Sequence, residues 1–429
     1  MFDGLVRESL IELERKSSER FVLLKQSGLS LDLTRGKPSP EQMALSDPLE
    51  TMWNGDYYLA DGTDVRNYGG LTGIQEARLL GAELLGVSPS AVIAGGNSSL
   101  TLMYQYLLNA WLNGPLGPGT AWRHETGPLK FICLVPGYDR HFTIVENIGF
   151  ELINVNIGAD GPDMNRIEEL VTEDPSIKGI WCVPKYSNPT GHVYSDGIVE
   201  RFAQLGRRAG ANFRIMWDNA YAVHDFDEEP PKLPNLMDCC RAAGTTDSVV
   251  MFTSTSKITR AGAGISFVAA SAANLEAFKA HLSVQTIGPD KINQLRHIQF
   301  LKNAAGVRDL MRKHASIVRP KFDRVLHHLH VGLSPHKIST WSTPRGGYFI
   351  SFNAPPGSAA TIVKLAGDAG LKLTPAGATF PGGRDPDDSN IRLAPTYPSL
   401  EELDRAMPVF VEAVTLSAVR QQLQFLSDT

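Results

Sequence analysis

Long apolar runs are missing from this sequence, and so is any excess of positive charge. The most apolar stretch, residues 261–273, is shorter than the roughly 20 residues needed to span a bilayer and is interrupted by glycine. The 41 lysines and arginines are outnumbered by 46 aspartates and glutamates, which gives a formal net charge of −5. We therefore expect no membrane association and no nucleic-acid partner.

Cysteine is also scarce, and its spacing excludes several classes of protein. None of the four cysteines belongs to a C-x-x-C pair, and two fall in apolar runs expected to be buried strands; the four are Cys133, Cys182, Cys239 and Cys240. Such thiols are typical of a reduced, intracellular protein without a zinc site. Residues 1–16 contain neither the apolar core nor the cleavage site of a signal peptide. We expect a cytoplasmic protein that binds no metal.

What the sequence does contain is enough apolar side chain for a large core. The 429 residues are 42% hydrophobic and 20% charged, which is close to the globular average and suggests two or three domains. Short apolar runs alternate with helical patterns through the middle of the chain. This alternation predicts an α/β fold with a large, mostly parallel seven-stranded sheet covered by helices on both faces. We expect its strands at residues 91–94, 131–135, 152–157, 179–183, 213–217, 249–252 and 264–269.

The pattern changes after about residue 315. A helix is expected at 321–330, and it is followed by strands at 347–352 and 391–393, a helix at 359–369 and a final helix from residue 399. This order predicts a smaller α+β domain, beside which we place the first residues, with a helix at 5–27. The sequence therefore predicts a large domain of residues 46–315 and a small domain formed by residues 1–45 and 316–429.

Ligands of open parallel sheets bind beyond the carboxyl ends of the strands, so the residues after each apolar run are the candidates for a site. The segment Gly95-Gly96-Asn97-Ser98-Ser99 opens a helix there. Glycines allow close backbone approach, and the free helix N–H groups and hydroxyls are donors, as in an anion site that most often binds phosphate. Taken alone, the segment is also explained by a glycine turn with a serine cap.

Three other strand ends carry polar residues that have simple explanations when taken singly. Asn188 lies in a turn-forming segment, Asp218 directly follows an apolar run and is placed like a helix cap, and Lys257 follows hydroxyl residues and is placed like a solvated lysine. Together, and with Tyr221, they match what pyridoxal phosphate requires: an anion cradle, a carboxylate for the ring nitrogen, amide and phenol donors for the phenolic oxygen, and an amine for the aldehyde. The sequence therefore predicts pyridoxal 5′-phosphate as the cofactor.

The chain resembles the class I aminotransferases of the fold-type-I pyridoxal-phosphate superfamily, and in detail a divergent bacterial subgroup of aspartate aminotransferases. The matching stretches run from Leu33-Thr34-Arg35-Gly36-Lys37-Pro38 to Asn390-Ile391-Arg392-Leu393. The most specific is Ser187-Asn188-Pro189-Thr190-Gly191, followed in order by Asp218-x-x-Tyr221 and Ser254-x-Ser256-Lys257. The resemblance implies the fold-type-I architecture, aminotransferase activity on an amino acid and a 2-oxo acid, and a homodimer with active sites at the subunit interface.

The resemblance also implies a role for each matched residue. Lys257 would form the Schiff base with the cofactor and then carry a proton. Asp218 would pair with the ring nitrogen, Asn188 and Tyr221 would donate to the phenolic oxygen, and Tyr138 would stack on the ring. The phosphate would be held by Asn97, Ser98, Ser99, Ser254 and Ser256, together with Tyr68 of the partner subunit. The substrate's α-carboxylate would be bound by Arg392 with the backbone of Gly36 and with Asn188.

The sequence departs from the family pattern at one position. The usual pattern places a phosphate-binding arginine eight residues after the lysine, but position 265 is isoleucine here. Two explanations stay open. Either Arg260 takes that role from a different position, or hydroxyls and helix N–H groups suffice.

The leading interpretation is transfer of the amino group of L-aspartate to 2-oxoglutarate, which gives oxaloacetate and L-glutamate. An aromatic or kynurenine-type donor, or a β-lyase acting on cysteine conjugates, are the alternatives. A cofactor-binding regulator is disfavoured because about 30 residues precede the Arg35-Gly36 pair, too few for a winged-helix domain, and because the lysine is intact.

Preference for a dicarboxylic donor requires a second cation about one side-chain length from Arg392. Arg140 is the best-placed candidate, although it is also explained as a solvated helix residue. Arg35 is the runner-up, and His141 would give a weaker contact that depends on pH.

Overall fold

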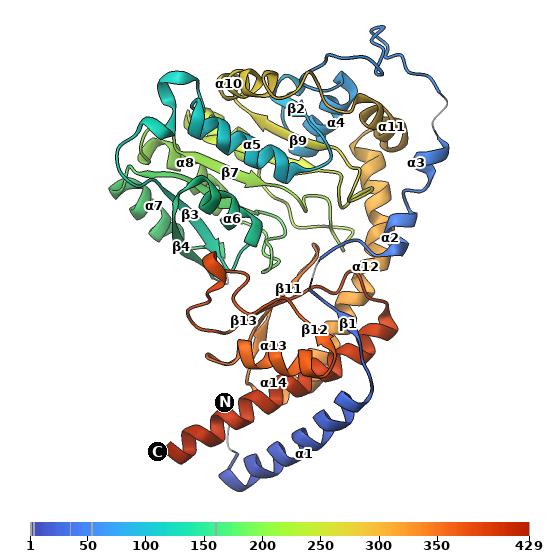
Figure 1. Ribbon diagram of the computed structural model, residues 1–429, viewed down its shortest axis with the longest axis vertical. Coiled ribbons are helices and arrows are strands. Elements are labelled where there is room, and N and C mark those ends of the chain that lie inside the picture. The colour runs from blue at the N-terminus through green and yellow to red at the C-terminus, as the bar shows by residue number, and fades with distance from the viewer. Residues whose placement is uncertain (1, 3–4, 35, 53–54, 159–160, 429) are drawn as a thin grey trace.

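The larger of the main sheets has eight strands in the order β2-β9-β8-β7-β6-β3-β4-β5 (Figure 1). The computed structural model describes residues 2, 5–34, 36–52, 55–158 and 161–428. Neighbouring strands from β8 through β7, β6 and β3 to β4 are parallel, whereas β9 and β5 run antiparallel to their neighbours. The strands are β2 Val92–Ala94, β3 Lys130–Val135, β4 Glu151–Gly158, β5 Gly161–Pro162, β6 Ile177–Cys182, β7 Arg214–Asp218, β8 Val249–Ser254 and β9 Ser266–Ala270.

The predicted α/β fold is confirmed, and all seven expected strands are present. The two-residue strand β5 adds an eighth at the edge, too short to stand out in the sequence. Strands β6 and β8 are buried along their whole length, because helices cover both faces of the sheet and leave no polar side to alternate. One face packs against α4 Gln75–Leu85, α7 Met164–Glu173, α8 Asp196–Arg208 and α9 Leu236–Ala243. The other packs against α5 Ser99–Leu112, α6 Asp139–Ile148 and α10 Ala272–Ser283.

A second hydrophobic core lies around a small antiparallel sheet in the order β10-β11-β13. Its strands are β10 Thr340–Trp341, β11 Ile350–Asn353 and β13 Asn390–Leu393, and a separate parallel pair joins β1 Leu31–Asp32 to β12 Leu371–Lys372. The covering helices are α1 Arg7–Gln26, α13 Ala359–Asp368 and α14 Leu400–Asp428. Figure 1 shows α1 lying along α14, so the two ends of the chain share this core.

Helix α12, Ala304–Leu333, joins the two halves of the molecule. Figure 1 shows it running from the large sheet to the small one. Val307 and Met311 belong to the first core, and Val318 and Phe322 to the second. The helix begins at Ala304 and not at residue 321 as expected, because the buried polar residue His314 and the internal Pro320 interrupt the apolar pattern. The remaining helices are α2 Pro40–Ala44, α3 Pro48–Thr51 and α11 Lys291–Leu301.

Candidate active site

A cavity of about 220 Å³ lies beyond the carboxyl ends of β3, β6, β7 and β8, and residues of the small sheet close it. Parallel strands end at the same edge, which is why residues far apart in the sequence meet there. The structure brings nine of the predicted site residues to its wall: Gly36, Ser99, Tyr138, Arg140, Asn188, Asp218, Tyr221, Lys257 and Arg392. Arg35 lies outside the described residues.

Asp218, the last residue of β7, presents a carboxylate at the base of the cavity. Its side chain is buried, and its Oδ2 lies 3.0 Å from Nε2 of His141. Its Oδ1 has no hydrogen-bond partner in the part of the chain that the structure describes. A buried carboxylate oxygen without a donor is costly, so this atom is suited to receive an N–H from a bound group.

His141 is a site residue whose position the sequence did not reveal. The sequence offered it only as a weaker candidate for the distal carboxylate, and in the structure its ring is 2% exposed and stacks on Trp181 at a centroid distance of 4.1 Å. Its Nε2 faces Asp218. A usable signal was its spacing from Tyr138, because residues three apart at the start of a helix share a face.

Lys257 follows β8 and lies near the aromatic side of the cavity. Its Nζ is 4.9 Å from the ring centroid of Tyr221. Burial raises the pKa of Tyr221, and the neighbouring Asp218 raises it further. Burial also raises the pKa of Tyr138 to about 12. Both phenols therefore keep their protons at neutral pH and are available as hydrogen-bond donors.

Arg392, in β13, forms the side of the cavity that belongs to the small sheet. Its Nη1 lies 3.4 Å from Oδ1 of Asn188 and 3.7 Å from Oδ1 of Asp139, and its guanidinium lies 4.8 Å from the ring centroid of Phe349. Its buried Nε has no partner among the described residues. A planar guanidinium with an unused donor suits two-point binding of a carboxylate.

Gly36 approaches the same phenylalanine closely. A Cβ at this position would lie 2.4 Å from Cζ of Phe349, so a side chain here would displace the ring beneath Arg392. Arg140 is exposed, and it lines the cavity on the α6 side. Among the described residues, the arginines that line the cavity are Arg392 and Arg140.

The predicted anion cradle is assembled from two loops that hydrogen bonds hold together. Oγ of Ser256 donates to the carbonyl of Asn97 at 3.0 Å, and Oγ of Ser254 lies 3.2 Å from Oγ of Ser256. The side-chain amide of Asn97 donates to the carbonyl of Gly262 at 2.9 Å. Ser99 faces the main cavity, whereas Asn97 and Ser98 line an adjoining cavity of about 340 Å³.

The predicted ligand Tyr68 and the alternative Arg260 do not line this cavity in their own chain. The guanidinium of Arg260 bonds to Glu50 and lies 3.7 Å from Asp47. Tyr68 is 84% exposed and lies on the surface.

Comparison with known proteins places this geometry in context. Residues 5–425 match the family described as aspartate amino-transferase. The aspartate aminotransferase of Corynebacterium glutamicum is 45% identical over 416 residues, which cover 97% of this chain and 94% of that protein.

Solved structures agree with this match. The crystal structure of an aspartate transaminase from Corynebacterium glutamicum superposes with a TM-score of 0.93 at 44% identity and covers 98% of both chains. An α-aminoadipate aminotransferase of Thermus thermophilus, complexed with N-(5′-phosphopyridoxyl)-L-leucine, shares the fold at 20% identity, with a TM-score of 0.73 and coverage of 96% of this chain and 98% of that one. These likenesses confirm the predicted fold class.

Proposed function

The chain belongs to the aspartate amino-transferase family and is an aminotransferase, and we propose that it transfers the amino group of L-aspartate to 2-oxoglutarate, giving oxaloacetate and L-glutamate. The observation that carries the choice of substrates is the presence of Arg392 and Arg140 in the lining of one cavity. Aspartate, glutamate and both 2-oxo acids are dicarboxylates, and each would use both cations. A monocarboxylic donor would leave Arg140 without a partner.

The proposal assigns pyridoxal 5′-phosphate as the cofactor, and the residues present fit it. The unpartnered Oδ1 of Asp218 is an acceptor for the ring N–H, and Asn188 and Tyr221 line the same cavity as donors. When bound, the cofactor supplies an aldehyde carbon for the amine and a ring that accepts the electron pair released at the substrate's Cα.

Each residue then has a definite task. Lys257 would hold the cofactor through its amine and would take up the proton released from the substrate's Cα. Asp218 keeps the ring nitrogen protonated. Arg392 binds the α-carboxylate of the substrate, Arg140 binds the distal carboxylate, and Tyr138 covers the ring. Ser99, Ser254 and Ser256 hold the phosphate with the backbone N–H groups at the start of α5.

We further propose that two copies of the chain form the active unit and that Tyr68 completes the phosphate site of the partner subunit. Lys291 is 5% exposed, and its Nζ donates to the carbonyls of Asn67 and Gly69 at 2.7 Å each, which fixes the loop that presents Tyr68. Val284 and Ile287 are also exposed, at 86% and 61%. A second copy would cover such side chains.

Two expectations from the sequence complete the proposal. The domain division at residue 315 is supported by α12, which passes from one hydrophobic core to the other near that point. A cytoplasmic location is supported by the four cysteines, all of which are free thiols.

The proposed function is tested by a donor panel. The cofactor-loaded protein is given 2-oxoglutarate with aspartate, alanine, phenylalanine or kynurenine, and glutamate formation is measured. A parallel assay measures pyruvate release from a cysteine conjugate. We expect the highest kcat/KM with aspartate. A higher value for an aromatic donor, or faster pyruvate release, would overturn the assignment of aspartate.

A further inference from the structure

The segment that carries Gly36, residues 36–44, is tied to α12 by buried polar contacts. Gln42 is fully buried, and its Nε2 lies 3.0 Å from Nδ1 of His314 and 3.1 Å from the hydroxyl of Tyr348. Its Oε1 accepts from the backbone N–H of Ser39 at 3.1 Å. Both amide hydrogens and the amide oxygen of Gln42 are therefore engaged, which fixes the orientation of its side chain.

His314 connects this segment to the lysine loop. Its Nε2 lies 3.0 Å from the carbonyl oxygen of Ile258, the residue after Lys257. A carbonyl oxygen only accepts, so Nε2 carries the hydrogen, and Nδ1 must accept from Gln42. Burial lowers the pKa of His314 to about 4, which keeps the ring uncharged at neutral pH and leaves Nδ1 able to accept.

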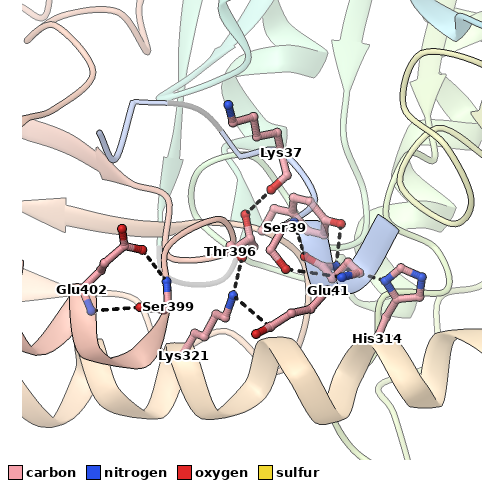
Figure 2. Close-up of polar contacts among 10 residues, drawn as sticks. Lys37, Ser39, Glu41, His314, Lys321, Thr396, Ser399 and Glu402 are labelled. Atoms are coloured by element: carbon pink, nitrogen blue, oxygen red, sulfur yellow. Dashed lines mark hydrogen bonds and ion pairs between the residues drawn. The ribbon is translucent and has the colours of Figure 1, made fainter. Parts of the chain in front are cut away.

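A second set of hydrogen bonds connects α12 to the Gly36 segment, two helical turns further along the same face of the helix. Nζ of the buried Lys321 donates to the carbonyl of Thr396 at 3.0 Å, and Oγ1 of Thr396 donates to the carbonyl of Lys37, also at 3.0 Å. Lys37 follows Gly36, and Thr396 lies just beyond the strand that contains Arg392. Figure 2 shows His314 and Lys321 pointing from one helix to the segment of Lys37 and Ser39. Nζ of Lys321 also lies 4.0 Å from Oε2 of Glu41.

We propose that His314 is a positioning residue that holds the Gly36 segment and the backbone of Ile258, the residue after Lys257, at one point of α12. It thereby sets the distance between the site of the substrate's carboxylate and the amine of Lys257. This inference rests on the proposed function, which assigns the substrate's carboxylate to Gly36 and the cofactor to Lys257. It does not depend on which amino acid is the donor.

The two hydrogen bonds of His314, one to Gln42 and one to Ile258, can be removed separately by substitution. In His314→Gln, the amide nitrogen reaches the position of Nε2 and keeps the bond to Ile258, but nothing replaces Nδ1. In His314→Asn, the shorter amide reaches the position of Nδ1 and keeps the contact with Gln42, but the bond to Ile258 is lost. Removal of one buried neutral hydrogen bond corresponds to about a five- to ten-fold effect.

Steady-state kinetics of the cofactor-loaded variants separate positioning from simple stabilisation. We expect His314→Gln to raise KM for donor and acceptor alike by about five- to ten-fold with little change in kcat, because it frees the Gly36 segment. We expect His314→Asn mainly to lower kcat by a similar factor, because it frees the backbone of Ile258, next to Lys257. Should a histidine variant not fold, Gln42→Leu removes the contact with His314 together with those to Tyr348 and Ser39, and it is expected to raise KM by at least as much as His314→Gln.

Hydrogen exchange of the cofactor-loaded protein without substrate gives a readout that is independent of activity. Amide exchange should rise within residues 36–44 in His314→Gln and around 257–259 in His314→Asn. The control is Asn274→Ala, which removes a buried amide bonded to Tyr106 and Arg214. It should lower Tm without changing either segment.

Two results overturn the proposal. One is a lower Tm in both His314→Gln and His314→Asn, with KM, kcat and the exchange of both segments all at wild-type values. The other is an equal rise in amide exchange within residues 36–44 and around 257–259 in both variants. Failure of the proposed function gives a different result. The wild-type protein would then not turn over aspartate, while hydrogen exchange in the variants would still show whether His314 holds the two segments.

Discussion

Nε2 of His141 lies 3.0 Å from Oδ2 of Asp218, and this contact leaves Oδ1 of the same carboxylate without a partner among the described residues. Trp181 stacks on the imidazole and fixes its plane. The histidine therefore sets the orientation of the carboxylate, and the unpartnered oxygen belongs to a residue of the cavity wall. A charge held in this way is expected to act on a bound ring rather than to cap a helix.

The first prediction concerns that charge. Asp218→Asn keeps the size of the side chain but cannot keep a ring nitrogen protonated. We expect kcat/KM to fall by about 100- to 1000-fold, while the urea midpoint of unfolding changes little. A loss of only two- or three-fold would make Asp218 a structural residue. Asn274→Ala, in a buried network elsewhere, is the control for stability.

Arg140 is expected to select the substrate. A charge-assisted pair that the bound substrate buries contributes about 1.5–3 kcal/mol, so Arg140→Ala should reduce kcat/KM for aspartate by roughly ten- to a hundred-fold. Donors without a distal carboxylate, such as phenylalanine, should be spared. Equal losses for all donors would show that Arg140 acts on the cofactor or on the fold.

The buried histidines predict how stability depends on pH. Burial lowers the pKa of His224 to about 3, and Lys257 contributes; burial also lowers the pKa of His314 to about 4, from 6.5 in each case. The unfolded chain therefore binds more protons below pH 6.5, and stability that is complete above that pH is lost as the pH falls toward 4. Each group contributes a slope of at most about 1.4 kcal/mol per pH unit. Urea unfolding between pH 7 and 4.5 measures this slope, and His314→Gln should reduce it; an unchanged slope would contradict the prediction.

Subunit mixing tests the partner role of Tyr68. Tyr68→Phe should bind the cofactor more weakly, and Lys257→Ala should be inactive. A mixed dimer of the two contains one site with an intact Lys257 and an intact Tyr68 from the other chain. In the mixed dimer, purified after co-expression with two different tags, we expect wild-type cofactor affinity to be restored at half of the sites. A fully active monomer in sedimentation would exclude this arrangement.

The strand-end residues followed from the sequence because parallel strands bring their carboxyl ends to one edge, which makes Lys257, Asp218 and Asn188 neighbours. The roles of Arg392 and Gly36 came only from the family resemblance, since no local pattern places a residue of β13 opposite β7. The contact between Gln42 and His314 could not be predicted, because it depends on how α12 crosses between the two cores. Arg260 illustrates the same limit, because its partner Glu50 is far away in the sequence.

The site as a whole depends on Lys257 as the residue that carries the cofactor. Borohydride reduction of the cofactor-loaded protein, followed by proteolysis and mass spectrometry, locates the modified lysine. We predict one phosphopyridoxyl group on the peptide that contains Lys257, with loss of the visible absorbance and of activity. A label on another buried lysine, such as Lys185 or Lys291, or an unmodified Lys257 in a fully reduced and inactive protein, would contradict the account.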